Sequence, residues 1–343
     1  MRSDVSVIVP TYNRAAYIAR TIDAILAQTV RPCEVLVIDD GSSDDTESVC
    51  ARYGARVRYV RQPNGGVSKA RNHGASLATG HWLAFCDSDD IWRADKLAAQ
   101  LAVLEATNGR WSITGAETID LEDRRVDGRP GMAGIFPIFR DELTTPEELL
   151  SRYLVEGTAT TADGPFTFFH GDAYVPLFLG NFALPSSAIV ERDLFLASTG
   201  FDPSFRLAEE TEFFHRLAAM APVVLVMSPL VGYRVAQANS LVSSANLGRL
   251  IENALESNAR AAALRAPLDD RGARHVRMGR SRLLRKLAIA EIAAGRRASA
   301  RKAVMDARAL NTLGGSRDYA VLVLSVLPDR LLALGLAIWR ARR

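Results

Sequence analysis

The sequence predicts an α/β fold: a mixed, mostly parallel, Rossmann-like sheet covered by helices, followed by a helical C-terminal extension. Two observations support this prediction. Through residue 120, apolar runs of strand length alternate with segments of helical periodicity, a rhythm typical of parallel strands joined by covering helices. From Ala245 onward helical periodicity dominates, with many Ala, Leu and Arg residues.

The composition is typical of a globular protein, because 48% of the 343 residues are hydrophobic and 24% are charged. This length allows two domains, or one large domain with an appendage. The cysteines Cys33, Cys50 and Cys86 show no metal-ligand spacing and indicate buried thiols in a reducing compartment. The N-terminus shows no signal-peptide pattern, so a cytoplasmic location is expected.

The net charge of +3 hides an asymmetry along the chain. Residues 260–343 contain 19 Lys and Arg against 6 Asp and Glu, so the remainder of the chain is acidic. Such a basic tail is typical of a segment that binds nucleic acid or an anionic membrane surface, or of a helix with a solvated, charged face. Aromatic residues are scarce there, which argues against a nucleic-acid partner.

The elements of the first half follow from apolar runs and their boundaries. Strands are predicted at residues 5–9, 34–38, 57–60, 82–86 and 111–120. Helices are predicted at residues 15–28, from the turn at 39–46 through 53, and at 68–78 and 95–106. Asn13 and Ser68 are the expected caps of the first and third helices.

The second half gives fewer signals, above all in residues 131–180, which are rich in Pro, Gly and Phe. A loop or hairpin is predicted at 122–130, strands at 181–190 and 222–227, and helices at 146–153, 192–198 and 209–220. Near the C-terminus, apolar runs at 319–327 and 331–339 are divided by a polar triplet, and neither reaches the ~20 residues that span a bilayer. They predict an interfacial or oligomer-contacting helical hairpin, with ordinary packing on the preceding domain as the alternative.

An acidic cluster follows the strand at 82–86. Asp87 and Asp89 stand at i and i+2, so an extended backbone would direct both carboxylates to one side. Divalent cations neutralise such crowded charges through oxygen ligands, which predicts a metal-binding D-x-D. The alternative is a solvated loop in which Asp90 or Asp95 caps the next helix.

Two other strand ends also carry polar residues, at 10–13 and 39–40, and ligands of such sheets bind beyond the carboxyl ends of the strands. The chain contains neither G-x-G-x-x-G after the first strand nor a P-loop motif. Binding of a phosphate group would therefore depend on a metal and on cationic side chains such as Lys69 and Arg71, which follow the Gly65-Gly66 turn at a helix start. A plain helix start with solvated cations is the alternative.

Four segments together resemble the family 2 glycosyltransferases, which have the nucleotide-sugar-binding GT-A fold. They are VSVIVPTYNR at 5–14, VIDDGSSDDT at 37–46, NGGVSKARNHG at 64–74 and FCDSDDIW at 85–92. The resemblance covers about residues 4–240. It implies a catalytic domain at 1–240, with a nucleotide-binding half at 1–120 and an acceptor half at 121–240. Residues 241–343 would form a basic helical region that contacts a membrane or a second subunit.

The resemblance implies inverting transfer from a nucleoside-diphosphate sugar, most often a UDP-sugar, to a saccharide or lipid-linked acceptor, assisted by Mn²⁺ or Mg²⁺. Carried over by position, Pro10 and Tyr12 would line the base pocket and Asp39 would accept a hydrogen bond from uracil. Arg71 would support the nucleotide, Asp87 would contact the ribose or the metal, and Asp89 would bind the metal. The expected setting is bacterial-type cell-envelope polysaccharide synthesis on the cytoplasmic face of the membrane.

Two positions depart from the family pattern. The general base of the family is the acidic residue that ends a Glu-Asp pair, and here Glu210 stands at that Asp position, with Glu209 and Glu212 left as alternatives. Ala236 replaces a His that helps to hold the diphosphate or metal, and Arg234 or Gln237 would substitute for it. If these changes abolish chemistry, the chain is a non-catalytic nucleotide-sugar-binding partner subunit. A phosphotransfer or phosphatase use of the acidic cluster is disfavoured, because a haloacid-dehalogenase-like site needs Asp-x-Asp-x-Thr/Val and no Thr or Val follows Asp90.

Overall fold

The computed structural model describes residues 3–126, 150–162, 164–235, 247–265 and 267–310. The chain divides into two compact units, residues 1–238 and 239–343, which are described separately. Several predictions lie outside the described residues: most of the helix at 146–153, the end of the segment 122–130, Ala236 with Gln237, and the apolar runs at 319–327 and 331–339.

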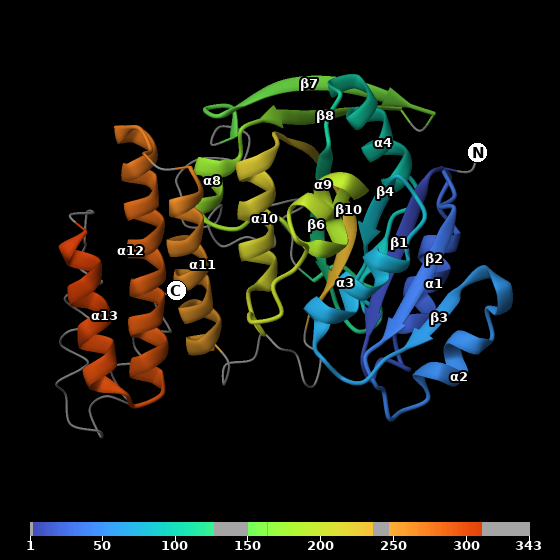
Figure 1. The fold of residues 1–343 in the computed structure, drawn as a ribbon, viewed down its shortest axis with the longest axis horizontal. Coiled ribbons are helices and arrows are strands. Elements are labelled where there is room, and N and C mark those ends of the chain that lie inside the picture. Colours follow the sequence, from blue (N-terminus) through green and yellow to red (C-terminus); the bar gives the residue numbers. More distant parts are fainter. Residues whose placement is uncertain (1–2, 127–149, 163, 236–246, 266, 311–343) are drawn as a thin grey trace. The chain divides into compact units, whose positions relative to one another are not determined.

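The described part of the first unit is built on a ten-stranded mixed sheet in the order β3-β2-β1-β4-β9-β6-β10-β8-β7, with β5 paired to β10 (Figure 1). Its strands are β1 (Val5–Thr11), β2 (Glu34–Asp39), β3 (Arg58–Arg61), β4 (Trp82–Phe85), β5 (Ile91–Trp92), β6 (Trp111–Ile119), β7 (Leu154–Thr161), β8 (Gly164–Gly171), β9 (Ile189–Glu191) and β10 (Val223–Arg234). Strands β3, β2, β1 and β4 pair in parallel, as do β6 and β10, whereas β9, β8, β7 and β5 pair antiparallel.

Helices cover both faces of the parallel strands. The helices of this unit are α1 (Ile18–Leu26), α2 (Thr46–Ala51), α3 (Val67–Leu77), α4 (Lys96–Thr107), α8 (Tyr174–Leu179), α9 (Arg192–Ala197) and α10 (Glu209–Met220). Val7 and Val9 of β1 belong to the core that α1 completes, and the alternate residue Ile8 meets α3 on the other face. At Gly74 of α3 an added Cβ would lie 2.5 Å from Ile8 Cγ2, so glycine permits this close helix–sheet contact.

Two strand predictions are corrected, and one hairpin was not predicted. The strand expected at 181–190 is only Ile189–Glu191, because a 3-10 turn occupies Pro185–Ser187, where proline lacks an N–H and Ser187 Oγ donates to the Leu184 carbonyl (2.7 Å). The strand expected to end at 227 continues to Arg234 through register shifts around Pro229. The β7–β8 hairpin arises in the stretch that showed no clear pattern.

The second unit contains three helices in its described part: α11 (Leu247–Leu264), α12 (Asp270–Ala293) and α13 (Arg297–Ala309), which run side by side (Figure 1). Asp269 caps α12 by accepting a hydrogen bond from the Gly272 N–H (2.7 Å). Small and branched side chains, including Ala288 and Ile292, form the contact between α12 and α13. Among the helices of the described residues, none has both the length and the apolar composition needed to cross a bilayer.

Candidate functional site

Three polar segments meet at one edge of the sheet. Strands β2, β1 and β4 are parallel neighbours, and Thr11 at the end of β1 pairs with Asp39 at the end of β2. Because the carboxyl ends of parallel strands share an edge, the segments that follow these strands lie together there. The prediction that the polar strand ends lie together at one edge of the sheet is therefore confirmed.

The acidic stretch after β4 is a tight turn, in which the Asp90 N–H donates to the Asp87 carbonyl (3.0 Å). The expected extended backbone is therefore wrong. Asp90 does not cap α4, since its buried carboxylate accepts hydrogen bonds from Ser186 Oγ and from the Arg234 backbone N–H (3.1 Å). Burial, with the charges of Asp89 and Asp87, raises the pKa of Asp90 well above its ordinary value. Asp95 precedes α4 but makes no side-chain capping bond.

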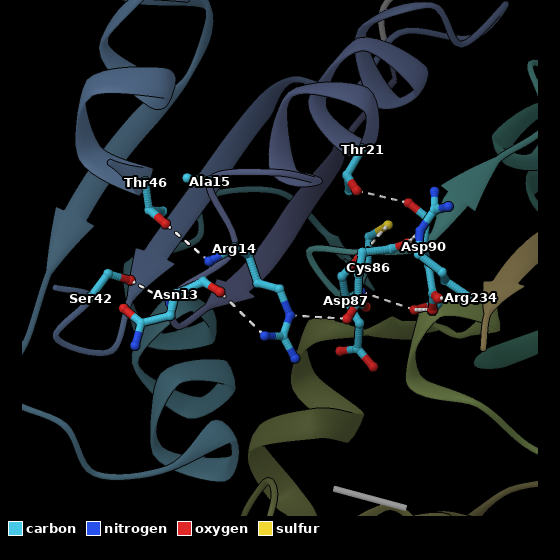
Figure 2. A network of polar contacts seen from close by, with 12 residues as sticks. Asn13, Arg14, Ala15, Thr21, Ser42, Thr46, Cys86, Asp87, Asp90 and Arg234 are labelled. Atoms are coloured by element: carbon cyan, nitrogen blue, oxygen red, sulfur yellow. Dashed lines mark hydrogen bonds and ion pairs between the residues drawn. The ribbon is translucent and has the colours of Figure 1, made fainter. Parts of the chain in front are cut away.

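The two predicted metal ligands are each paired with an arginine. Asp87 Oδ1 lies 2.7 Å from Arg71, and Asp89 Oδ2 lies 3.1 Å from Arg14 Nε. The Asp87 and Asp89 side chains are 31% and 18% exposed, so both carboxylates lie at the surface of the site. Figure 2 shows Arg14 directed from the end of β1 toward the turn that carries Asp87 and Asp90.

Arg71 connects the two halves of the first unit. It extends from α3 and is only 3% exposed, and it bonds Asp87 on one side and Glu209 Oε1 (2.9 Å) on the other. Its guanidinium carbon also lies 4.9 Å from the centre of the Phe201 ring. Since Glu209 begins α10, this buried cation joins the acidic turn to the helix that carries the candidate general bases.

The three candidate bases at the start of α10 have different surroundings. Glu209 is held by Arg71, and Glu212 forms a bidentate pair with Arg216 (2.6 Å for each bond). No ion pair joins Glu210 to another residue in the described part of the chain. Burial and the adjacent charge of Glu209 raise the pKa of Glu210 to about 8. Of the three, Glu210 has the environment that suits proton transfer near neutral pH.

The expected base-pocket residues differ in accessibility. Pro10 is buried within β1, whereas Tyr12 is 48% exposed just beyond the end of the strand. Asp39 is fully buried, and its oxygens accept hydrogen bonds from the Tyr59 hydroxyl and the Ser42 N–H (2.7 Å). The Asp39 carboxylate therefore binds groups of the protein itself and lies beneath the exposed edge of the sheet.

Asp40 holds the glycine turn before α3. Its carboxylate accepts hydrogen bonds from the Gly65 N–H (2.9 Å) and the Gly66 N–H (2.7 Å), and from Gln62 Nε2 (2.7 Å). Gly66 has φ +90°, a backbone conformation that favours glycine. The turn at the helix start is thus fixed by a buried carboxylate from the neighbouring strand end.

Ser186 and Arg14 were not singled out from the sequence, and Arg234 was expected in another role. Ser186 accepts a hydrogen bond from the Asp87 N–H (2.9 Å) while donating to Asp90, and nothing in the local sequence indicates this contact. Arg234, expected to approach the diphosphate, is instead fully buried and donates to the backbone carbonyls of Asp89 (2.8 Å) and Asp120. Arg14 belongs to the first family-like segment. Its position shortly after a strand end was the one feature of the sequence that could have indicated a role in the site.

The profile of the Glycosyl transferase family 2 matches residues 6–157. An uncharacterized glycosyltransferase of Rickettsia felis is 39% identical over 126 residues, 36% of this chain and 21% of that protein. The putative teichuronic acid biosynthesis glycosyltransferase TuaG of Bacillus subtilis is 37% identical over 115 residues, 32% of this chain and 46% of TuaG. The chain thus spans less than half the length of these curated relatives.

The fold as a whole is similar to a solved structure, S. aureus TarS 1–349 in complex with UDP-GlcNAc. The TM-score is 0.57, and the match covers 94% of this chain and 90% of that one. Sequence identity is 16%, so this likeness concerns the fold.

Proposed function

We propose that this chain, whose residues 6–157 match the Glycosyl transferase family 2 and whose fold is similar to that of TarS, is a family 2 glycosyltransferase that transfers a sugar from a nucleoside-diphosphate sugar to a saccharide or lipid-linked acceptor. We infer that the donor is a UDP-sugar and that the reaction inverts the anomeric centre. The UDP-GlcNAc bound in the TarS complex, a protein of similar fold, supports the choice of donor.

One observation carries this proposal. Two partly exposed carboxylates, Asp87 and Asp89, lie at the edge of the sheet, and Arg71 links Asp87 to the helix that bears Glu210. Glu210 is close enough to Asp87 and Arg71 for both charges to affect its pKa. The carboxylate proposed to bind the donor, Asp87, and the proposed proton acceptor, Glu210 with a pKa of about 8, are thus close enough to interact electrostatically.

Asp87 and Asp89 fit a divalent cation such as Mn²⁺ or Mg²⁺. Within the described residues no group of three or more His, Cys, Asp or Glu side chains could hold a metal ion. Two carboxylates nevertheless suit Mg²⁺-like ions, which usually complete their coordination with substrate phosphates and water. When bound, the metal would neutralise the charge that develops on the leaving diphosphate.

The residues of the chain have separate roles in this proposal. Tyr12 and Pro10 form the base pocket, with the exposed Tyr12 ring stacking on the base. Asp39 supports the pocket wall through Tyr59 and Ser42. Glu210 removes the proton from the acceptor hydroxyl as that oxygen attacks the anomeric carbon from the face opposite the diphosphate.

We further propose that the protein acts in cell-envelope glycan synthesis, as the name of TuaG suggests for that relative. The basic C-terminal region would then contact the inner face of the membrane or a second subunit. Deleting residues 316–343 should release the protein from membranes, measured by membrane fractionation. Full retention after the deletion would count against this role.

The test of the proposed function is a hydrolysis screen with purified protein, a panel of UDP-, GDP- and dTDP-sugars, and Mn²⁺, Mg²⁺ or EDTA. Slow metal-dependent release of nucleotide from one donor would support the proposal and name the sugar. No release with any donor, even after addition of a membrane lipid extract as acceptor, together with normal UDP binding, would favour the non-catalytic partner subunit.

A further inference from the structure

Three arginines contact the acidic turn, and they differ in how firmly their side chains are held. Arg71 and Arg234 are 3% and 0% exposed, and each makes several bonds and lies against an aromatic ring. Arg14 is 23% exposed, and within the described residues its side chain bonds only Asp89 (3.1 Å) and the Asn13 carbonyl (3.2 Å). Arg14 is therefore the one of these three cations whose side chain can change partner at little cost.

The backbone that carries Arg14 is held firmly (Figure 2). The Asn13 N–H donates to Ser42 Oγ (2.9 Å), and the Arg14 N–H donates to Thr46 Oγ1 (3.0 Å). The Ala15 N–H donates to Asp44 Oδ2 (3.0 Å). Asn13 has φ +52°, a left-handed conformation that asparagine tolerates better than most residues. A fixed backbone thus presents a partly exposed guanidinium at the edge of the sheet that also carries Tyr12 and the acidic turn.

The charges of the expected ligands, a divalent cation and a diphosphate, determine which partner the Arg14 guanidinium can bind. A divalent cation on Asp89 would stand beside Arg14, and two cations that share one carboxylate repel each other. A diphosphate removes this conflict, since its oxygens accept hydrogen bonds from a guanidinium and also bind a metal. Arg14 has no other described anion within ion-pair distance to which it could turn.

We propose that Arg14 is a diphosphate-binding residue, which neutralises Asp89 in the donor-free protein and transfers to the phosphate oxygens when the nucleotide binds. This inference rests on the proposed function, because it assumes a nucleoside-diphosphate donor at this edge. The contact is a charge-assisted hydrogen bond between the guanidinium and a phosphate oxygen, and no covalent bond changes. While the donor is absent, Arg14 lowers the affinity of Asp89 for metal.

The experiment compares wild type, Arg14→Gln and the control Arg93→Gln. Arg93 is a 58% exposed arginine whose Nε is paired with Asp95 (3.4 Å), so its substitution removes the same charge outside the site. UDP and uridine are titrated by calorimetry or NMR in EDTA. Arg14→Gln should weaken UDP binding about tenfold, which corresponds to about 1.4 kcal/mol, and should leave uridine binding unchanged. Arg93→Gln should bind both ligands as wild type does.

A second titration uses Mn²⁺ alone, which Arg14→Gln should bind more tightly than wild type. Equal UDP affinity in wild type and Arg14→Gln would overturn the inference and leave the proposed function intact. An equal loss of UDP and uridine binding would also overturn it, because that pattern indicates structural damage. If wild type binds neither UDP nor any other nucleoside diphosphate, the proposed function fails as well.

Discussion

The pKa of Glu210 gives a quantitative test of the reaction mechanism. A general base accepts a proton only in its deprotonated form, and burial with the charge of Glu209 raises the pKa of Glu210 to about 8. At pH 7 only about one tenth of the molecules carry the deprotonated carboxylate, and at pH 9 about nine tenths do, as expected for a single group that titrates near pH 8. The transfer rate should therefore rise about tenfold over this interval, as proton removal from Glu210 activates the enzyme.

Substitutions separate this residue from its neighbours. Glu210→Gln should lower kcat by about 10²–10⁴ and remove the rise with pH, because an amide cannot accept the proton. Glu209→Gln removes a charge that raises the pKa of Glu210, so it should move the midpoint of the profile to lower pH. Glu212→Gln is a control on the same helix, since Glu212 is paired with Arg216 outside the proposed chemistry.

The assay follows release of UDP at saturating donor and acceptor between pH 6 and pH 9.5, with circular dichroism to confirm folding of each variant. A flat profile in wild type would refute the assignment of a base with a raised pKa. Undiminished turnover in folded Glu210→Gln would refute the choice of Glu210 and move the role to another group.

Three further substitutions test the site and the fold. Asp89→Asn should abolish the Mn²⁺-dependent part of UDP binding in calorimetry while leaving a metal-independent part; retained metal dependence would exclude Asp89 as a ligand. Arg71→Met leaves two buried or partly buried carboxylates unpaired and should lower the free energy of unfolding in urea by about 3–5 kcal/mol. The matched change of the exposed Arg93, 58% exposed and paired with Asp95, should stay within about 0.5 kcal/mol, and similar losses for both would contradict this account. Gly74→Ala should destabilise by about 1–3 kcal/mol, because the added methyl overlaps Ile8 Cγ2; an unchanged melting temperature would show that the helix can move away.

The elements that the sequence predicts well are those with a strong local pattern. Strands β1, β2 and β4 are continuous apolar runs, because both faces of a central strand are buried. Helix α10 and the short helix α9 begin close to the expected positions, where the chain offers clear helical periodicity. The β7–β8 hairpin lacked such a pattern, since from Glu156 on the residues of β7 alternate only between exposed and half-buried, and its Gly, Ala and Thr side chains give little apolar contrast between the two faces.

The sequence by itself determined the order of strands and helices up to residue 120, the polar strand ends that gather at one edge, and the family resemblance, because these depend on residues close together in the chain. Only the tertiary structure decided which charges meet. Arg71 contacts Glu209 across 138 residues and Asp90 contacts Ser186 across 96, and no local period encodes such pairs. For the same reason, the distinction among Glu209, Glu210 and Glu212 was open in the sequence, since their partners and burial come from other elements. A carboxylate's pKa depends on its three-dimensional surroundings, and these exist only once the chain has folded.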